Sequence, residues 1–185
     1  KSQDWTVAIA LDRYGHACRF ERWQGPWETT IMRIDGLTGQ APALVDSTGV
    51  GDPIVEALQK RGGHRFNGYK FTPRSKQQLM EGLAVAIQRG QVTYPDGPIV
   101  SELEAFEFVY TRTGVVYSGP EGMHDDCVCA LSLACRQWQL RQAGMPYQWM
   151  ADDPLVRAEA AEIAAAMGVG AKAVENEEER IRKRE

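Results

Sequence analysis

The sequence predicts a mixed α/β fold, in which a central sheet of parallel and antiparallel strands is flanked by helices. Residues 6–12 (TVAIALD) and 17–23 (ACRFERW) alternate between apolar and polar side chains on either side of a turn, as in a β-hairpin. A second hairpin is predicted around Thr113 and Gly114. Between the hairpins, short apolar strands are each followed by an amphipathic helix, and this arrangement favours parallel pairing.

The order of the elements follows from local signals. Pro53 in a first turn, with Asp52 as N-cap and Gly62 at the end, predicts a helix. Leu79 and Leu83 share one face of a second helix. The full prediction has strands at 6–12, 17–23, 43–48, 68–72 and 92–95, a hairpin within 106–119, and helices at 27–34, 53–62, 73–90, 99–106, 125–144 and 153–168, with a charged tail after about residue 170.

The composition excludes several classes of protein. The chain has 185 residues, 43% hydrophobic and 25% charged, which suits one globular domain. No segment approaches the roughly 18 consecutive apolar residues of a membrane helix. The first residues, KSQDWTVAIALD, alternate like a strand and do not resemble a secretion signal. Because this start lacks an initiator Met, we expect the chain to be a piece of a longer protein.

The four cysteines are interpreted as free thiols. None forms a C-x-x-C pair, so the spacing does not favour zinc. Three of them lie in the apolar segment CVCALSLAC, where Val128, Leu131 and Cys135 share a helix face. We therefore expect buried thiols in a reducing cytoplasm; the cysteines are Cys18, Cys127, Cys129 and Cys135.

Three aspartates are the candidate catalytic and metal-binding residues. Asp46 ends a short apolar strand in ALVDSTGVGD, and ligands of open α/β sheets collect at the carboxyl ends of parallel strands. Asp125 and Asp126 begin a helix predicted to pack on the same sheet. Two plainer alternatives stay open: Asp46 as a turn residue, and Asp125 and Asp126 as helix-capping residues.

A divalent cation would resolve the repulsion between converging carboxylates. Hard oxygen ligands suit Mg²⁺ or Mn²⁺. Two such ions roughly 3.5–4 Å apart activate water and stabilise the leaving oxygen in phosphodiester cleavage. The sequence therefore favours a two-metal site that cleaves a nucleic acid.

A basic stretch supports a nucleic-acid substrate. Residues 57–80 contain no Asp or Glu, although the whole chain has a net charge of −4. The cations would hold a phosphate backbone beside the metals, unless they form only a solvated surface. The candidate DNA-binding residues are Lys60, Arg61, Arg65, Lys70, Arg74 and Lys76.

Four segments together resemble the C-terminal nuclease domain of phage large terminases. They are VDSTGVGDPIVEAL, GYKFTPRSKQQLMEGLAVAIQRGQVTYP, SELEAF and GMHDDCVCALSLA, and the resemblance covers about residues 4–140. It implies an RNase H-like domain at 1–145, followed at 146–185 by a helix and charged tail that belong to it or are appended. It also implies a Mg²⁺- or Mn²⁺-dependent endonuclease that cuts concatemeric viral double-stranded DNA during packaging, in the cytoplasm of the infected bacterium.

The same resemblance assigns roles to individual residues. Asp46 matches the second acid of the family, and Asp125 and Asp126 supply the third. His124 is expected behind the metal ligands or on a phosphate, and Glu102 matches a recurrent position without an assigned role. The family's first acid normally precedes a segment like KSQDWTVAIALD, so we expect it upstream of Lys1; Asp4 is interpreted as a turn residue.

The resemblance also implies partners and an ATPase motor. The expected partners are the terminase small subunit and the portal, and no membrane. The chain has no G-x-x-x-x-G-K-[ST] phosphate loop, so we expect the ATPase domain to precede this piece. Two alternatives to the nuclease stay open: a catalytically silent module that binds DNA or docks on a portal, and another RNase H-like enzyme such as a resolvase.

Overall fold

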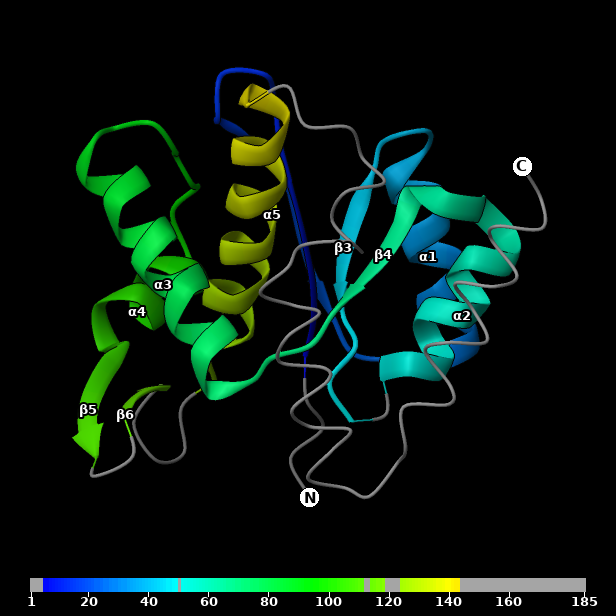
Figure 1. Cartoon of the computed structure of the whole chain (residues 1–185). Helices are drawn as coiled ribbons and strands as arrows, with labels where there is room; N and C mark the ends of the chain where they lie inside the picture. The colour runs from blue at the N-terminus through cyan, green and yellow to red at the C-terminus, as the bar shows by residue number, and fades with distance from the viewer. Residues whose placement is uncertain (1–4, 50, 112–113, 119–123, 144–185) are drawn as a thin grey trace, which may run out of the picture. The chain divides into compact units, whose positions relative to one another are not determined.

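The computed structural model of the chain describes residues 5–49, 51–111, 114–118 and 124–143 (Figure 1). These residues belong to a unit bounded by Lys1 and Tyr147. Asp4, the predicted helix at 153–168 and the charged tail lie outside the described residues, so the division of the chain near residue 145 stays a prediction. No helix in the described ranges is long and apolar enough to cross a membrane.

The predicted α/β class is confirmed. The described elements are, in order, β1 (Thr6–Leu11), β2 (Ala17–Trp23), α1 (Trp27–Thr38), β3 (Ala43–Asp46), α2 (Gly51–Gly62), a 3-10 turn (Gly63–Arg65), β4 (Phe66–Tyr69), α3 (Pro73–Gln88), α4 (Pro98–Ala105), β5 (Glu107–Thr111), β6 (Gly114–Ser118) and α5 (Asp126–Gln142).

The strands pair as the sequence predicts. β1 and β2 are antiparallel, as are β5 and β6, whereas β3 and β4 are parallel, with Asp46 opposite Tyr69. Within the described residues these pairs form three two-stranded sheets, with one isolated parallel bridge between His16 and Thr93. The bridge falls in the segment at 92–95 that we expected to be a brief strand.

Three predicted boundaries were wrong. α1 continues to Thr38 instead of ending at residue 34, and α2 begins at Gly51, so Asp52 lies in its first turn and is not the N-cap. β4 lies at Phe66–Tyr69, earlier than the predicted 68–72. The tertiary structure explains the last shift, because Phe66 is completely buried and pairs with Ala43 at the start of β3.

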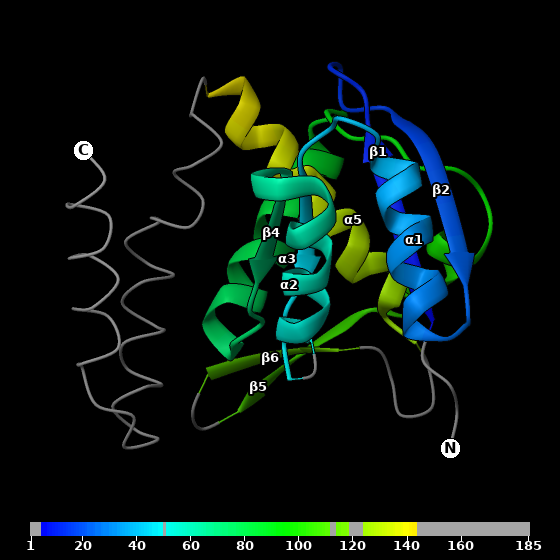
Figure 2. The same cartoon turned by 90° about the vertical axis from the view of Figure 1, so that its right-hand side faces the viewer.

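Helices lie on both sides of the β3–β4 pair, α1 and α2 on one side and α3, α4 and α5 on the other (Figures 1 and 2). α2 contacts β4, and α1 packs on α2. On the opposite side α5 contacts both β1 and β3, and α3 packs on α5. This arrangement brings the starts of α3 and α5 to the carboxyl ends of β3 and β4.

The main core joins α3, α4 and α5 to the first hairpin. Val128, Leu131 and Cys135 are buried on one face of α5, as predicted. Val7 and Ile9 of β1 pack against this cluster from the other side. The buried members of the cluster are Met80, Leu83, Ala86, Val92, Ile99, Cys127, Val128, Leu131 and Cys135. The apolar segment after the two aspartates thus anchors α5, and the burial of such side chains is the main stabilising term of a fold.

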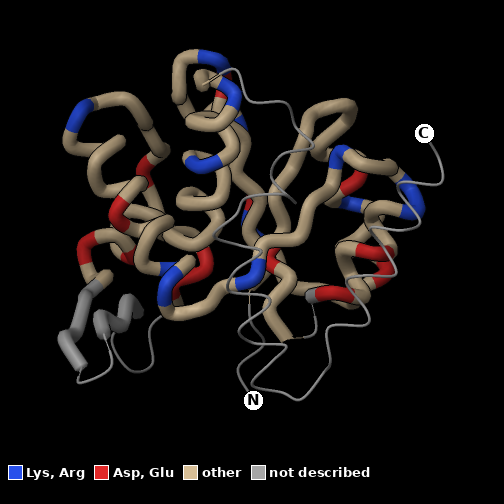
Figure 3. The backbone as a smooth tube through the Cα atoms, viewed as in Figure 1, with Lys and Arg blue, Asp and Glu red and all other residues tan. Residues whose placement is uncertain are grey.

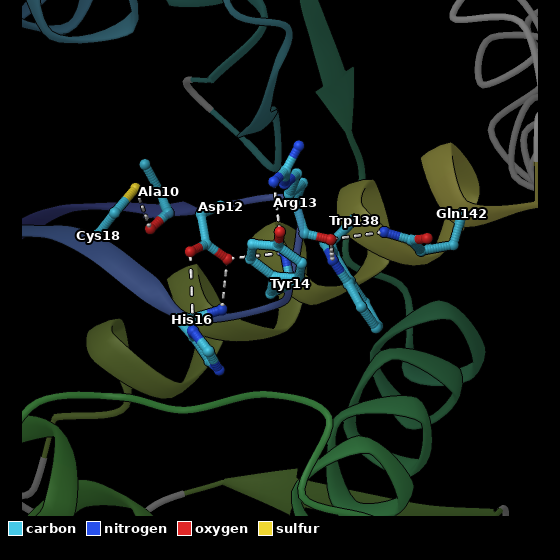
Figure 4. A network of polar contacts seen from close by, with 8 residues as sticks. All are labelled: Ala10, Asp12, Arg13, Tyr14, His16, Cys18, Trp138 and Gln142. Carbon is cyan, nitrogen blue, oxygen red and sulfur yellow. Dashed lines mark hydrogen bonds and ion pairs between the residues drawn. The ribbon is translucent and has the colours of Figure 1, made fainter.

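The turn of the first hairpin is hydrogen-bonded to the carboxyl-terminal end of α5 (Figure 4). The main-chain carbonyl oxygen of Arg13 accepts hydrogen bonds from Nε1 of Trp138 at 3.2 Å and Nε2 of Gln142 at 2.8 Å. Gly15 in this turn has φ 89°, and a Cβ atom there would lie 2.0 Å from the carbonyl oxygen of Gln91. Only glycine suits that position, because other residues would be strained and would clash.

Candidate metal and DNA-binding site

Asp46 ends β3 and begins a tightly held turn. Its Oδ1 atom accepts a hydrogen bond from the backbone N–H of Thr48 at 2.8 Å. The turn is joined to the end of β4, since Ser47 N–H donates to the carbonyl of Tyr69 and the backbone N–H of Phe71 donates to Oγ1 of Thr48. Asp46 thus adopts the turn geometry that we left open. The carboxylate is nevertheless exposed at the carboxyl edge of the β3–β4 pair.

Asp125 occupies the N-cap position of α5 but does not cap the helix with its side chain. Its Oδ2 atom instead lies 2.8 Å from Nζ of Lys76. Lys76 is held one turn into α3 by a capping box, in which the side chains and backbone N–H groups of Thr72 and Ser75 bond reciprocally. The position predicted for Asp125 is therefore confirmed, and its side chain is engaged between two helices.

Asp126 is half-buried beside Asp125. The backbone N–H of Trp5 donates to it, and Nδ1 of His124 lies 3.3 Å from its Oδ2 atom. That oxygen is buried and accepts no hydrogen bond of good geometry in the described part of the chain. Burial raises the pKa of Asp126, and the negative charges of Glu102 and Asp125 raise it further, against the attraction of His124.

The three aspartates lie at the end of β3 and the start of α5, two elements that contact each other. Burial, together with the negative charges of Asp125, Asp46 and Asp126 and against the charge of Lys76, raises the pKa of the Cys129 thiol to about 12. Burial alone would lower the pKa of Lys76, but the hydrogen bond to Asp125, together with the charges of Cys129, Asp125 and Asp46, raises it above its ordinary value. The end of β3 and the start of α5 are thus brought together as the sequence suggested.

The predicted basic stretch divides into two groups. Arg61 and Arg65, near the amino ends of β3 and β4, form ion pairs with Asp35 of α1. At the carboxyl ends, Lys70 pairs with Asp52 at 3.0 Å and Lys76 with Asp125. Figure 3 shows Lys and Arg in both places, around the end of α2 and at the start of α3.

Only the second group lies beside the aspartates. Its members are Lys70, Arg74 and Lys76, and we call them the carboxyl-edge cations. Lys60 is exposed and belongs to the group at the opposite edge, together with Arg61 and Arg65. The acids that pair with these cations are Asp35, Asp52 and Asp125. All three lie outside residues 57–80, so the sequence did not reveal the pairs.

The aspartates meet part of the requirement for a divalent metal. They are hard oxygen donors, and the buried Oδ2 atom of Asp126, which accepts no hydrogen bond in the described part of the chain, has the character of a metal ligand. Among the described residues, however, no group of three or more His, Cys, Asp and Glu side chains lies close enough to hold an ion. Lys76 supplies a positive charge at Asp125 in this arrangement.

In the part of the chain that the structure describes, the cysteines belong to no group of three or more His, Cys, Asp and Glu side chains that could hold a metal ion. Cys127 and Cys135 are buried and Cys129 is partly buried, as expected, but Cys18 on β2 is exposed, so the prediction of burial was wrong for that residue. Cys18 lies at the register shift of the hairpin, between Ala17 and Arg19, and its Sγ atom donates to the carbonyl oxygen of Ala10. All four cysteines are free.

Comparison with known proteins decides the family. The family model described as the terminase RNaseH-like domain matches residues 32–137, more than half of the chain. This chain belongs to that family. The large terminase subunits of Thermus phage G20c and Thermus virus P23-45 are each 34% identical to it over 75% of the chain, which spans only 30% of either relative.

Solved structures of terminase nucleases share the fold. The large terminase nuclease of phage G20c is 33% identical, with 74% of this chain and 77% of that one covered and a TM-score of 0.65. Its magnesium-bound form gives a TM-score of 0.68 over 74% and 76% of the chains, at 33% identity. A cobalt-bound form is 28% identical, with a TM-score of 0.62 over 74% and 82%. This chain is therefore a terminase nuclease domain with the RNase H-like fold that the sequence predicted.

Sequence inspection missed three residues around the terminase acids. Trp5 reaches Asp126 through its backbone, which no sequence pattern reveals. Arg22 lies 3.6 Å from Glu102 although the two are far apart along the chain. Thr72 begins a capping box, and the segment TPRS carried the signal, a threonine followed by proline and, three positions on, a serine.

Proposed function

We propose that this domain cuts double-stranded DNA with Mg²⁺ or Mn²⁺ held by Asp46, Asp125 and Asp126. The observation that carries the proposal is that β3, which ends at Asp46, contacts α5, which begins beside Asp125 and Asp126. The magnesium- and cobalt-bound relatives support a divalent cation. When bound, a pair of such ions would supply an activated water and charge stabilisation at the scissile phosphate.

The residues of this chain would prepare that chemistry. Asp46 and Asp125 face the metal position from a strand end and a helix start, which are rigid elements. His124 lies behind the oxygen of Asp126 that has no hydrogen bond, where it would fix the orientation of that carboxylate. The carboxyl-edge cations would bind phosphates beside the acids, and Arg74 is exposed for that purpose.

We further propose the role of the intact protein. Because the chain spans about a third of its curated relatives, an ATPase domain outside this piece would drive concatemeric DNA into the capsid, and this domain would cut it. The small subunit and the portal would be partners, and the reaction would take place in the cytoplasm of the infected bacterium. The family's first acid, expected upstream of Lys1, would complete the ligand set.

Plasmid cleavage tests the proposal. This chain and a version extended by ten residues of its natural upstream sequence are incubated with supercoiled plasmid in Mg²⁺, in Mn²⁺ and in EDTA. We expect metal-dependent cleavage, stronger in the extended version if the first acid lies there. Cleavage in EDTA would refute the metal role, and DNA binding without cleavage by either version would favour a catalytically silent module.

A further inference from the structure

The first turn of α5 lacks the side-chain cap that its sequence offers. The first N–H groups of a helix have no partner within the helix, and the N-cap side chain normally accepts from the N–H at the second or third helical position. Asp125 is the N-cap residue but makes no such hydrogen bond, because its carboxylate is paired with Lys76. The N–H of Cys127, at the second helical position, therefore needs another acceptor.

Glu102 provides that acceptor from a different helix. Its Oε2 atom lies 2.7 Å from the backbone nitrogen of Cys127. Glu102 is on α4, is only 6% exposed and lies three residues from Ile99, which is completely buried. A negative charge at a helix N-terminus also interacts favourably with the helix dipole. Glu102 thus makes the contact of an N-cap residue although it lies 25 residues earlier in the sequence.

The contacts continue from Glu102 to the other side of the acid pair. The Oε1 atom of Glu102 lies 3.6 Å from a terminal nitrogen of Arg22, and the Arg22 guanidinium stacks over the ring of Trp5, 4.2 Å from its centre. The backbone N–H of Trp5 in turn donates to Asp126. The first hairpin, α4 and the start of α5 therefore enclose Asp126 in one chain of contacts.

We infer that Glu102 is a positioning residue, which caps α5 from outside the helix and so leaves Asp125 free to face Lys76 and the metal position. This inference rests on the proposed function. Without the cap from Glu102, the N–H of Cys127 would need another acceptor, and an Asp125 carboxylate that turned from the N-cap position toward it would leave the site.

A plainer role has to be distinguished from this one. Glu102 could serve only as the counter-charge of Arg22, which is mostly buried. Two substitutions separate the roles. Glu102→Gln keeps an acceptor within reach of Cys127 but removes the charge, whereas Glu102→Asp keeps the charge near Arg22 but shortens the side chain by one methylene.

The test is Mg²⁺ affinity measured by isothermal titration calorimetry on each folded variant. We expect Glu102→Gln to bind Mg²⁺ nearly as the wild type does, and Glu102→Asp to bind about 10- to 100-fold more weakly, as for residues that orient metal ligands. The same substitutions at Glu104, which is exposed on the same helix, are the matched controls and should change nothing. The inference would be overturned if Glu102→Gln bound Mg²⁺ more weakly than Glu102→Asp, or if both variants bound Mg²⁺ as tightly as the wild type.

Amide hydrogen exchange at Cys127 provides a readout that needs no metal. Exchange should be faster in Glu102→Asp than in the wild type and close to the wild type in Glu102→Gln. If the wild type bound no Mg²⁺ while exchange followed this order, the proposed function would fail and the cap would stand. If the wild type bound Mg²⁺ while the exchange order was reversed, the cap alone would fail.

Discussion

Nζ of Lys76 lies 2.8 Å from Oδ2 of Asp125, and this contact joins the start of α3 to the start of α5 across 49 residues of sequence. Lys76 came from the predicted DNA-binding stretch and Asp125 from the predicted metal site. The ion pair places one residue of each predicted site beside the other. A cation bound at Asp125 would have to share this carboxylate with Lys76 or displace its ammonium.

Replacing Lys76 should make the fold more dependent on metal. In EDTA, Lys76→Met should lower the free energy of unfolding by about 1 kcal/mol, because the acids lose their neighbouring cation. Added Mg²⁺ should then raise the melting temperature of the variant more than that of the wild type. Thermal unfolding in EDTA and in Mg²⁺ measures both effects. An equal Mg²⁺-induced shift in the two proteins would contradict the prediction.

Asp46→Asn should lower metal-dependent plasmid cleavage by more than about 100-fold while the fold is retained. Asparagine can still accept the hydrogen bond from Thr48 N–H, so the turn should survive and only the charge is lost. The initial rate of nicking, with circular dichroism as the folding control, measures the effect. Asp96→Asn, at an exposed acid in a loop, is the matched variant and should cut normally. Full activity of Asp46→Asn would remove Asp46 from the site.

Asp126→Asn should stabilise the metal-free protein at neutral pH. Burial raises the pKa of Asp126 in the folded state, so the charged carboxylate destabilises the fold at pH 7, and this cost is relieved as the pH falls through the raised pKa. The gain from asparagine should therefore be largest at pH 7 and shrink toward pH 4. Urea unfolding in EDTA at several pH values measures it. Equal stability of the two proteins at pH 7 would show that burial of this charge has no net cost.

The cysteines should differ sharply in reactivity. Burial raises the pKa of Cys127 and Cys129 to about 12 and that of Cys135 to about 11, so almost no thiolate exists at pH 8. Cys18 is exposed. Titration of the native protein with a disulfide reagent should modify one thiol rapidly, and all four in denaturant. Rapid loss of a second thiol in the native protein would contradict the burial of the three on α5.

Arg74→Ala should weaken DNA binding and reduce the slope of log K against log salt by about 0.9, the effect of one lost phosphate contact on duplex DNA. Lys60→Ala removes an equally exposed cation at the opposite edge of the β3–β4 pair and should leave the slope unchanged. Fluorescence anisotropy in EDTA at several salt concentrations measures both. If the slope in Arg74→Ala equalled that of the wild type, or if the slope in Lys60→Ala were lower, the DNA would not run along the carboxyl-edge cations as proposed.

Local sequence signals predicted the elements well where one signal dominated. The apolar face of α3 and the glycine at residue 90 predicted a helix at 73–90, close to the observed Pro73–Gln88. The β4 segment was displaced because GYKFT has a strand-like composition, whereas burial of Phe66 and pairing with β3 decided which residues form the strand. Propensity is a weak guide when packing favours a neighbouring register.

The sequence by itself determined the fold class and the family, and it predicted three aspartates as site residues, because periodicity, capping residues and motif spacing are local properties of the chain. The tertiary structure alone decided the partners of those aspartates. It paired Asp125 with Lys76, placed Glu102 on the N–H of Cys127, and divided the basic stretch between two edges of a strand pair. These contacts depend on which segments pack together, and packing is a property of the whole fold that no short stretch of sequence contains.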